Sequence, residues 1–224
     1  YAVFMMIFVF IAIVCFAAVF VIAYTRCLTI ALTNRRIYDD LRHLGAPPVY
    51  LQAGIGDTLA KWYEARVLCE PEDTLPLTAQ IGLSVARQIH DVLIEEGPDA
   101  LTATATGTLN APFLRVLDAV IAGGGLVGGL GERYTRLAAA HSIHNGLTVL
   151  PQTAEFLHGA KVAYGILVQL ALEARHDELA FLDTALKALG LPRRLAELNV
   201  DIDHRESIDA FIAHTLRRGE SIHF

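Results

Sequence analysis

The first 24 residues constrain this chain more than any other part of its sequence. From Tyr1 to Tyr24 the chain is apolar without interruption, with no charged residue, proline, glycine, asparagine or glutamine. About 20 apolar residues in a helix are enough to cross the hydrocarbon core of a membrane. The run therefore predicts one transmembrane helix over residues 1–24, and a buried core helix is the alternative.

Basic residues after the run predict how that helix is oriented. The span is followed by Arg26, Arg35, Arg36 and Arg42, and no basic region precedes it as in a signal peptide. Because arginine and lysine accumulate on cytoplasmic flanks, the C-terminal side is expected in the cytoplasm. The prediction is a single-pass membrane protein with a cytoplasmic C-terminal domain, or a cytoplasmic protein if the span is not used.

Beyond residue 46 the apolar residues recur at helical spacing, and no convincing strand pattern with a period of two is present. A helix over residues 77–96 is expected to stop at Gly97-Pro98, and Asn110 is expected to cap the next one. The glycines of residues 123–128 indicate a flexible turn, and residues 161–174 indicate a central buried helix.

The predicted fold class is therefore all-α. Residues 1–45 form one domain, the transmembrane helix and its flank, and residues 46–224 form a second domain, a helical bundle. A net charge of −6 with scattered basic residues argues against a nucleic-acid partner. The three cysteines have no metal-type spacing, and a reducing compartment fits them better than a disulfide framework.

Four side chains near glycines are candidates for a metal site. Asp57 follows Gly54-Ile55-Gly56, and His141 and His144 lie three residues apart on one helix face. His158 is expected in a loop just before the buried helix. One carboxylate and two imidazoles would bind a zinc-like or iron-like ion and leave a coordination position open, as catalytic sites do. Nine histidines also produce pairs by chance, so the spacing alone leaves a purely structural role open.

Three segments together resemble the glycerol dehydrogenases of the iron-containing alcohol dehydrogenase superfamily. They are GIGDTLAKWYEA (54–65), AAAHSIHNGLTVLP (138–151) and HGAKVAYGILVQLALE (158–173), in the order found in that family. The resemblance extends to GESIHF at residues 219–224, and family members continue beyond that segment, so the second domain is expected to be truncated at its C-terminus.

The resemblance implies a metal-dependent, NAD-linked oxidation of a small polyol or alcohol. It assigns Asp57, His141 and His158 as metal ligands, and His144 as a catalytic residue beside the site, with a structural histidine as the alternative. Lys61 stands where iron-type members often place another histidine, which favours zinc. Ala160 stands where the family commonly has glutamate, which puts one outer hydrogen bond in doubt. A homo-oligomer is left open.

A second resemblance concerns residues 33–47 (TNRRIYDDLRHLGAP), which are similar to the end of an FtsX-like ABC-transporter permease. Only about 50 residues precede the aspartate motif, too few for the βαβ units of a dinucleotide-binding domain. The expectation is therefore a dehydrogenase half that binds metal and is inactive alone. The alternatives are a permease-like membrane fragment with a passenger domain, and a join of two unrelated coding fragments near residues 46–51.

Overall fold

The protein is described by a computed structural model that defines residues 47–70 and 74–223. All regular structure in these residues is helical, and they contain no strand, which confirms the all-α fold class for this part of the chain. Contacts along the chain separate Tyr1–Ala46 from a helical unit, Pro47–Phe224. The predicted transmembrane helix, and all of the permease-like segment except Pro47, lie outside the described residues.

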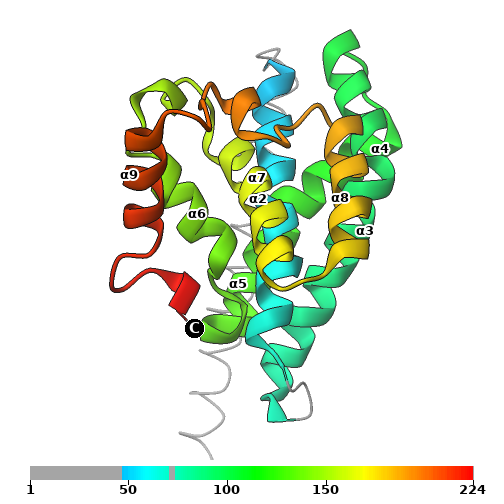
Figure 1. The fold of residues 1–224 in the computed structure, drawn as a ribbon. Coiled ribbons are helices and arrows are strands. Elements are labelled where there is room, and N and C mark those ends of the chain that lie inside the picture. Colours follow the sequence, from blue (N-terminus) through cyan, green and yellow to red (C-terminus); the bar gives the residue numbers. More distant parts are fainter. Residues whose placement is uncertain (1–46, 71–73, 224) are drawn as a thin grey trace, which may run out of the picture. The chain divides into compact units, whose positions relative to one another are not determined.

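The helical unit is built from eight α-helices with short helical turns between them (Figure 1). The α-helices are α2 (Pro48–Leu68), α3 (Leu77–Thr106), α4 (Ala111–Asp118), α5 (Gly124–Gly131), α6 (Ala139–Leu147), α7 (His158–Leu172), α8 (His176–Ala188) and α9 (Arg205–Thr215). A π-helical turn, Ala119–Gly123, joins α4 to α5, and 3-10 turns cover Glu132–Thr135, Pro151–Thr153, Leu195–Leu198 and Ser221–His223.

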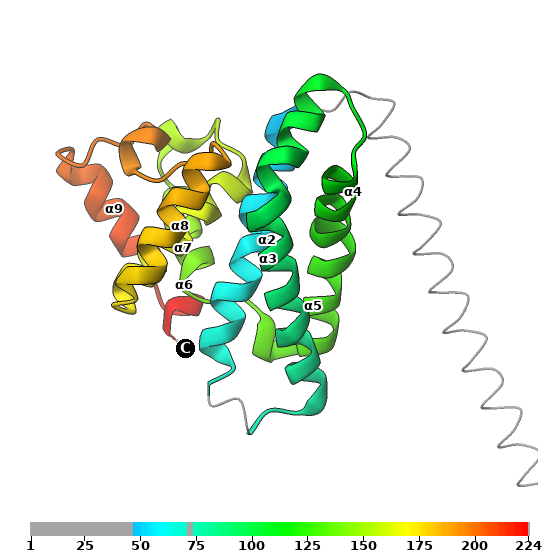
Figure 2. The same cartoon turned by 90° about the vertical axis from the view of Figure 1, so that its right-hand side faces the viewer.

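Helix α2 lies at the centre of this unit. Helices α3 and α7 pack on it, α6 packs on α7, and α9 covers α6 (Figures 1 and 2). Ile55, Leu59 and Tyr63 of α2 are almost completely buried, as are Leu93 of α3 and Ile166 of α7. The side chains that the centre of the bundle encloses therefore come from elements far apart in the sequence.

Glycines set the closest approaches around α2 and α7. A Cβ atom at Gly56 would lie 2.5 Å from the carbonyl oxygen of Gly159, and one at Gly159 would collide with the carbonyl of Ala53. At Gly165, α7 passes the backbone of Ala140 on α6 just as closely. Because a side chain at any of these positions would push two backbones apart, glycine is needed where α2, α6 and α7 approach most closely.

Helix α3 is longer than the sequence pattern predicts. It was expected to stop at Gly97-Pro98, but it continues to Thr106 with Pro98 inside it. Continuation buries Ala100 and Ala103, although Pro98 removes one main-chain hydrogen bond and its ring crowds the carbonyl one turn earlier. The helix ends instead at Gly107, whose positive φ of 65° suits glycine.

The glycine-rich stretch was also predicted wrongly as a flexible turn. Its residues form the π-helical turn and α5, and Gly82 of α3 lies against the backbone of Gly131. The Asn110 cap is confirmed, since its side chain accepts a 2.8 Å hydrogen bond from the N–H of Phe113. Of the described helical segments, Ala111–Thr135 alone is long and apolar enough to span a membrane, by length and composition only.

Candidate metal centre

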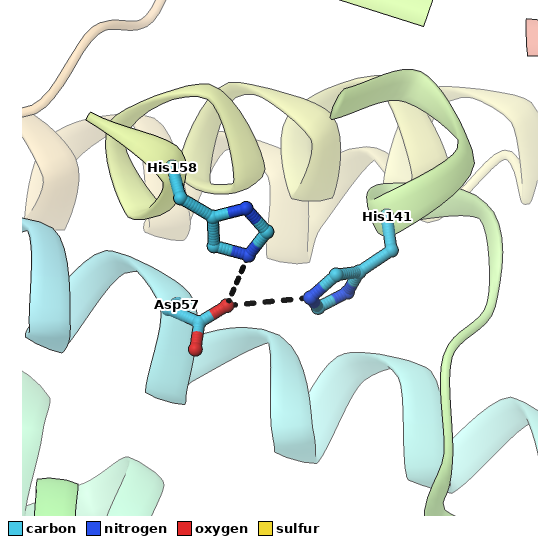
Figure 3. Close-up of side chains that lie close together, drawn as sticks. All are labelled: Asp57, His141 and His158. Atoms are coloured by element: carbon cyan, nitrogen blue, oxygen red, sulfur yellow. Dashed lines mark hydrogen bonds and ion pairs between the residues drawn. The ribbon is translucent and has the colours of Figure 1, made fainter. Parts of the chain in front are cut away.

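Asp57, His141 and His158 come together where α2, α6 and the start of α7 meet (Figure 3). The Oδ1 atom of Asp57 lies 3.0 Å from Nε2 of His158 and 3.3 Å from Nε2 of His141. One ligand atom from each residue lies within 4.8 Å of the other two. Three side chains that are up to 101 residues apart in the chain thus converge on one point.

These separations fit a shared divalent cation. Zinc binds histidine nitrogen and carboxylate oxygen at about 2.0–2.2 Å in tetrahedral geometry, so two such ligand atoms lie about 3.4 Å apart across the ion. The two separations from Asp57 in the structure are close to that value. The donors are one oxygen and two nitrogens, the set of a zinc or iron site.

The local helix structure explains how each side chain is held. Asp57 lies in the middle of α2, directly after the glycine that allows α7 to approach. His158 is the first residue of α7, rather than a residue of the preceding loop as predicted. His141 lies in the first turn of α6, one residue after the backbone that Gly165 contacts.

Glu64 supports His141 from behind and was missed by the sequence analysis. Its Oε2 atom lies 2.7 Å from Nδ1 of His141, and its Oε1 atom accepts from the N–H groups of Ala138 and His141 at 2.8 and 3.0 Å. Glu64 is only 1% exposed. It follows Asp57 by seven residues, two turns along α2 on the same face, and that spacing is the sequence signal for it.

The electrostatics favour charged partners around Asp57. Burial opposes ionisation of Asp57, but hydrogen bonds and attraction from His141 and His158 outweigh it and lower its pKa. Burial likewise disfavours a charged His141, but Asp57 and Glu64 outweigh it and raise the pKa of His141 to about 9. In the metal-free protein, a protonated His141 therefore supplies positive charge beside Asp57.

His144 lies behind His158 rather than beside Asp57. Its Nε2 atom is 3.0 Å from Nδ1 of His158, and its Nδ1 atom is 3.1 Å from Oδ1 of Asn145. Burial, followed by the neighbouring His158, lowers the pKa of His144 to about 4. His144 thus contacts a candidate ligand, and its catalytic role stays a prediction.

The site opens to solvent on one side. The side chains of Asp57 and His158 are 36% and 51% exposed, whereas that of His141 is 9% exposed. A cation held by these three residues would keep an accessible coordination position for water or a hydroxyl oxygen, as catalytic metal sites do. Lys61 lies one turn beyond Asp57 on α2 and is not a member of the three-residue cluster found among the described residues.

Comparison with known proteins points to one family for the helical half. No protein-family profile matches the chain. The chain is 59% identical over 181 residues to hydroxycarboxylate dehydrogenase A of Escherichia coli, which covers 81% of this chain and 50% of that protein. It is 38% identical over 183 residues to glycerol dehydrogenase of Pseudomonas putida, covering 80% of this chain and 49% of that protein.

Solved structures give the same result. A probable glycerol dehydrogenase from Sinorhizobium meliloti matches with a TM-score of 0.71 and 34% identity, covering 80% of this chain and 50% of that one. Glycerol dehydrogenase of Schizosaccharomyces pombe matches with a TM-score of 0.70 and 32% identity, covering 80% and 45%. The chain spans about half the length of these relatives, and the similarity supports the glycerol dehydrogenase family. The permease resemblance of residues 33–47 stays a prediction.

Proposed function

We propose that Pro47–Phe224 is the metal-binding half of a glycerol dehydrogenase-like oxidoreductase. The observation that carries the proposal is the meeting of Asp57, His141 and His158 around one point, with ligand atoms within 4.8 Å of one another. Relatives named as glycerol and hydroxycarboxylate dehydrogenases support the reaction class, the oxidation of a small hydroxyl compound with NAD as the acceptor.

The roles of the residues follow from their contacts. Asp57, His141 and His158 would hold a divalent cation, which supplies Lewis acidity that lowers the pKa of a bound hydroxyl group. Glu64 fixes the ring of His141 through Nδ1 and leaves Nε2 directed at Asp57. The exposed sides of Asp57 and His158 give a small polyol or hydroxycarboxylate access to the site.

Zinc is our proposal for the cation, since Lys61 occupies the position at which iron-type members often place a fourth protein ligand. Three protein ligands and one open position are typical of catalytic zinc. We also propose that residues 1–24 anchor the chain in a membrane and that the helical unit is cytoplasmic. The alternatives remain a permease-like fragment with a passenger domain, or two joined coding fragments.

Metal analysis of the full chain tests the proposal. Purified protein loaded with zinc and dialysed is expected to retain one zinc ion per chain, and Asp57→Ala and His158→Ala are expected to retain almost none. His176→Ala changes an exposed histidine outside the cluster and serves as the matched control. Equal zinc content in all four proteins would contradict the proposed site.

Turnover is expected to need a dinucleotide-binding domain in addition. No strand is present in residues 47–70 and 74–223, whereas dinucleotide-binding domains are built from βαβ units. We propose that the 224-residue chain alone forms negligible NADH from glycerol or a 2-hydroxycarboxylate, even with zinc. Robust NADH formation would show that this part of the proposal is wrong.

A further inference from the structure

A line of polar side chains leads from His158 away from the candidate metal centre. It runs through His144 and Asn145 to Glu220, with neighbouring atoms 3.0, 3.1 and 2.8 Å apart. Arg217 closes the far end by donating from Nε to the other oxygen of Glu220 at 2.7 Å. Asn145, Glu220 and Arg217 have no part in the proposed function as described so far.

The chemistry at the far end fixes the direction of these hydrogen bonds. Hydrogen bonds from Arg217 and Asn145 outweigh burial and lower the pKa of Glu220, so it is a carboxylate and can only accept. Asn145 therefore donates from Nδ2 to Glu220, and its amide oxygen must face His144. An amide oxygen also only accepts.

The orientation of the Asn145 amide then fixes which ring nitrogens of His144 and His158 donate. Because Oδ1 of Asn145 accepts, Nδ1 of His144 carries the ring proton, and Nε2 of the neutral ring carries a lone pair. That lone pair faces Nδ1 of His158, which must donate to it. With a proton at Nδ1, His158 can give up the Nε2 proton that faces Asp57 and offer the lone pair of Nε2 to a cation bound there.

We propose that Asn145 and Glu220 are positioning residues that set the tautomer of His144 and thereby keep Nε2 of His158 free to bind the cation. The inference rests on the proposed metal-binding function. It assigns His144 a positioning role as well, since the ring touches the ligand His158 and not Asp57. Outer partners of this kind orient metal-binding histidines and fix their tautomers.

The packing of the C-terminal segment supports this role. A Cβ atom at Gly146 would collide with Thr215 and lie 2.8 Å from the carbonyl oxygen of Phe211, so α9 contacts α6 directly beside Asn145. That close approach places the turn after α9 where Glu220, which is only 9% exposed, reaches Asn145. Glu220 lies far beyond His158 in the sequence, yet it contacts the ring of His158 through Asn145 and His144.

The test uses the full chain with 15N-labelled histidine. Ring nitrogens with and without a proton have well-separated 15N shifts, and His144→Gln and His158→Gln assign the two rings. In metal-free wild-type protein we expect a proton on Nδ1 of His144. Asn145→Leu removes the oxygen that accepts from Nδ1 of His144. Glu220→Gln replaces a carboxylate, which can only accept, by an amide that can also donate, so the Asn145 amide can turn over. Both variants are expected to give a mixture of His144 tautomers.

Zinc affinity is measured in parallel on the same proteins. Loss of a partner bonded directly to a ligand typically weakens metal binding about 10- to 100-fold, so we expect a loss of about 10-fold for Asn145→Leu, one hydrogen bond further out, and a smaller loss for Glu220→Gln. Glu155→Gln is the matched control, because Glu155 accepts from Asn199 in an exposed pair and is no member of the hydrogen-bond line. Circular dichroism checks that each variant is folded, and Glu220→Gln stands in if Asn145→Leu is not.

The outcomes separate this inference from the function on which it rests. If wild type binds zinc and the variants keep both its affinity and the His144 tautomer, the positioning role is wrong. If wild type binds no zinc, the proposed function fails. In that case the tautomer shift in the variants still supports the hydrogen-bond line, and an unchanged tautomer overturns it.

Discussion

Replacing Gly56 by alanine should weaken metal binding without touching a ligand. The added Cβ would lie 2.5 Å from the carbonyl oxygen of Gly159 and 3.2 Å from the Cβ atom of Ala163. Ordinary contact begins at 3.4 Å, so the closest pair must separate by 0.9 Å. The obstructing oxygen belongs to the backbone and cannot rotate away, so α2 and α7 must move apart.

The displacement acts directly on the candidate metal centre. Asp57 follows Gly56 and His158 precedes Gly159, so widening the gap by 0.9 Å would move their ligand atoms from 3.0 Å toward about 3.9 Å, beyond the roughly 3.4 Å expected across zinc. Overpacking of this kind costs about 1–3 kcal/mol. If zinc binding must restore the wild-type spacing, the affinity falls about 5- to 150-fold.

Isothermal titration with zinc measures the effect. The matched control is Gly125→Ala, because a Cβ atom there meets nothing within 4 Å and alanine is the better helix former. The control is expected to bind zinc as wild type does. Wild-type affinity in a folded Gly56→Ala protein would refute the argument that glycine contacts set the ligand spacing.

Four further predictions follow from the structure. Glu64→Gln removes the carboxylate behind His141 and is expected to weaken zinc binding about 10- to 100-fold by titration, while a loss below twofold would contradict its supporting role. Since zinc must displace a proton from His141, whose pKa is about 9, zinc affinity should rise between pH 6.5 and pH 9; a flat profile over that range would contradict the assignment. The same raised pKa stabilises the metal-free fold below pH 6.5, and this contribution should be lost as pH rises to 9, measured by urea unfolding with His141→Gln as the control. Ile166→Ala, at a fully buried position of α7, should cost about 2–5 kcal/mol in the same unfolding assay, and a cost below about 1 kcal/mol would show that the site collapses around the cavity.

The part of the fold that depends on local chemistry could be predicted from the sequence. Asn110 followed by Pro112 predicts the start of α4, because the side chain caps the helix whatever lies around it. The three candidate ligands were also identified in advance, from a family resemblance rather than from their spacing. The structure adds that they converge on one point.

What depends on packing between distant segments was not predictable in this way. Pro98 signals a helix end locally, but the helix continues because Ala100 and Ala103 are buried by neighbours that the local pattern does not reveal. The glycines of residues 123–128 look flexible in isolation, yet Gly123 packs closely against Ile89 of α3. Glu64 was missed because its role depends on its contact with His141, 77 residues away in the sequence.

X-ray absorption at the zinc edge of the zinc-loaded full chain tests the central claim most directly. We expect only nitrogen and oxygen neighbours at about 2.0–2.2 Å, with the outer scattering of two imidazole rings. A sulfur neighbour at about 2.3 Å, or a spectrum without imidazole scattering, would show that the cation does not bind between Asp57, His141 and His158.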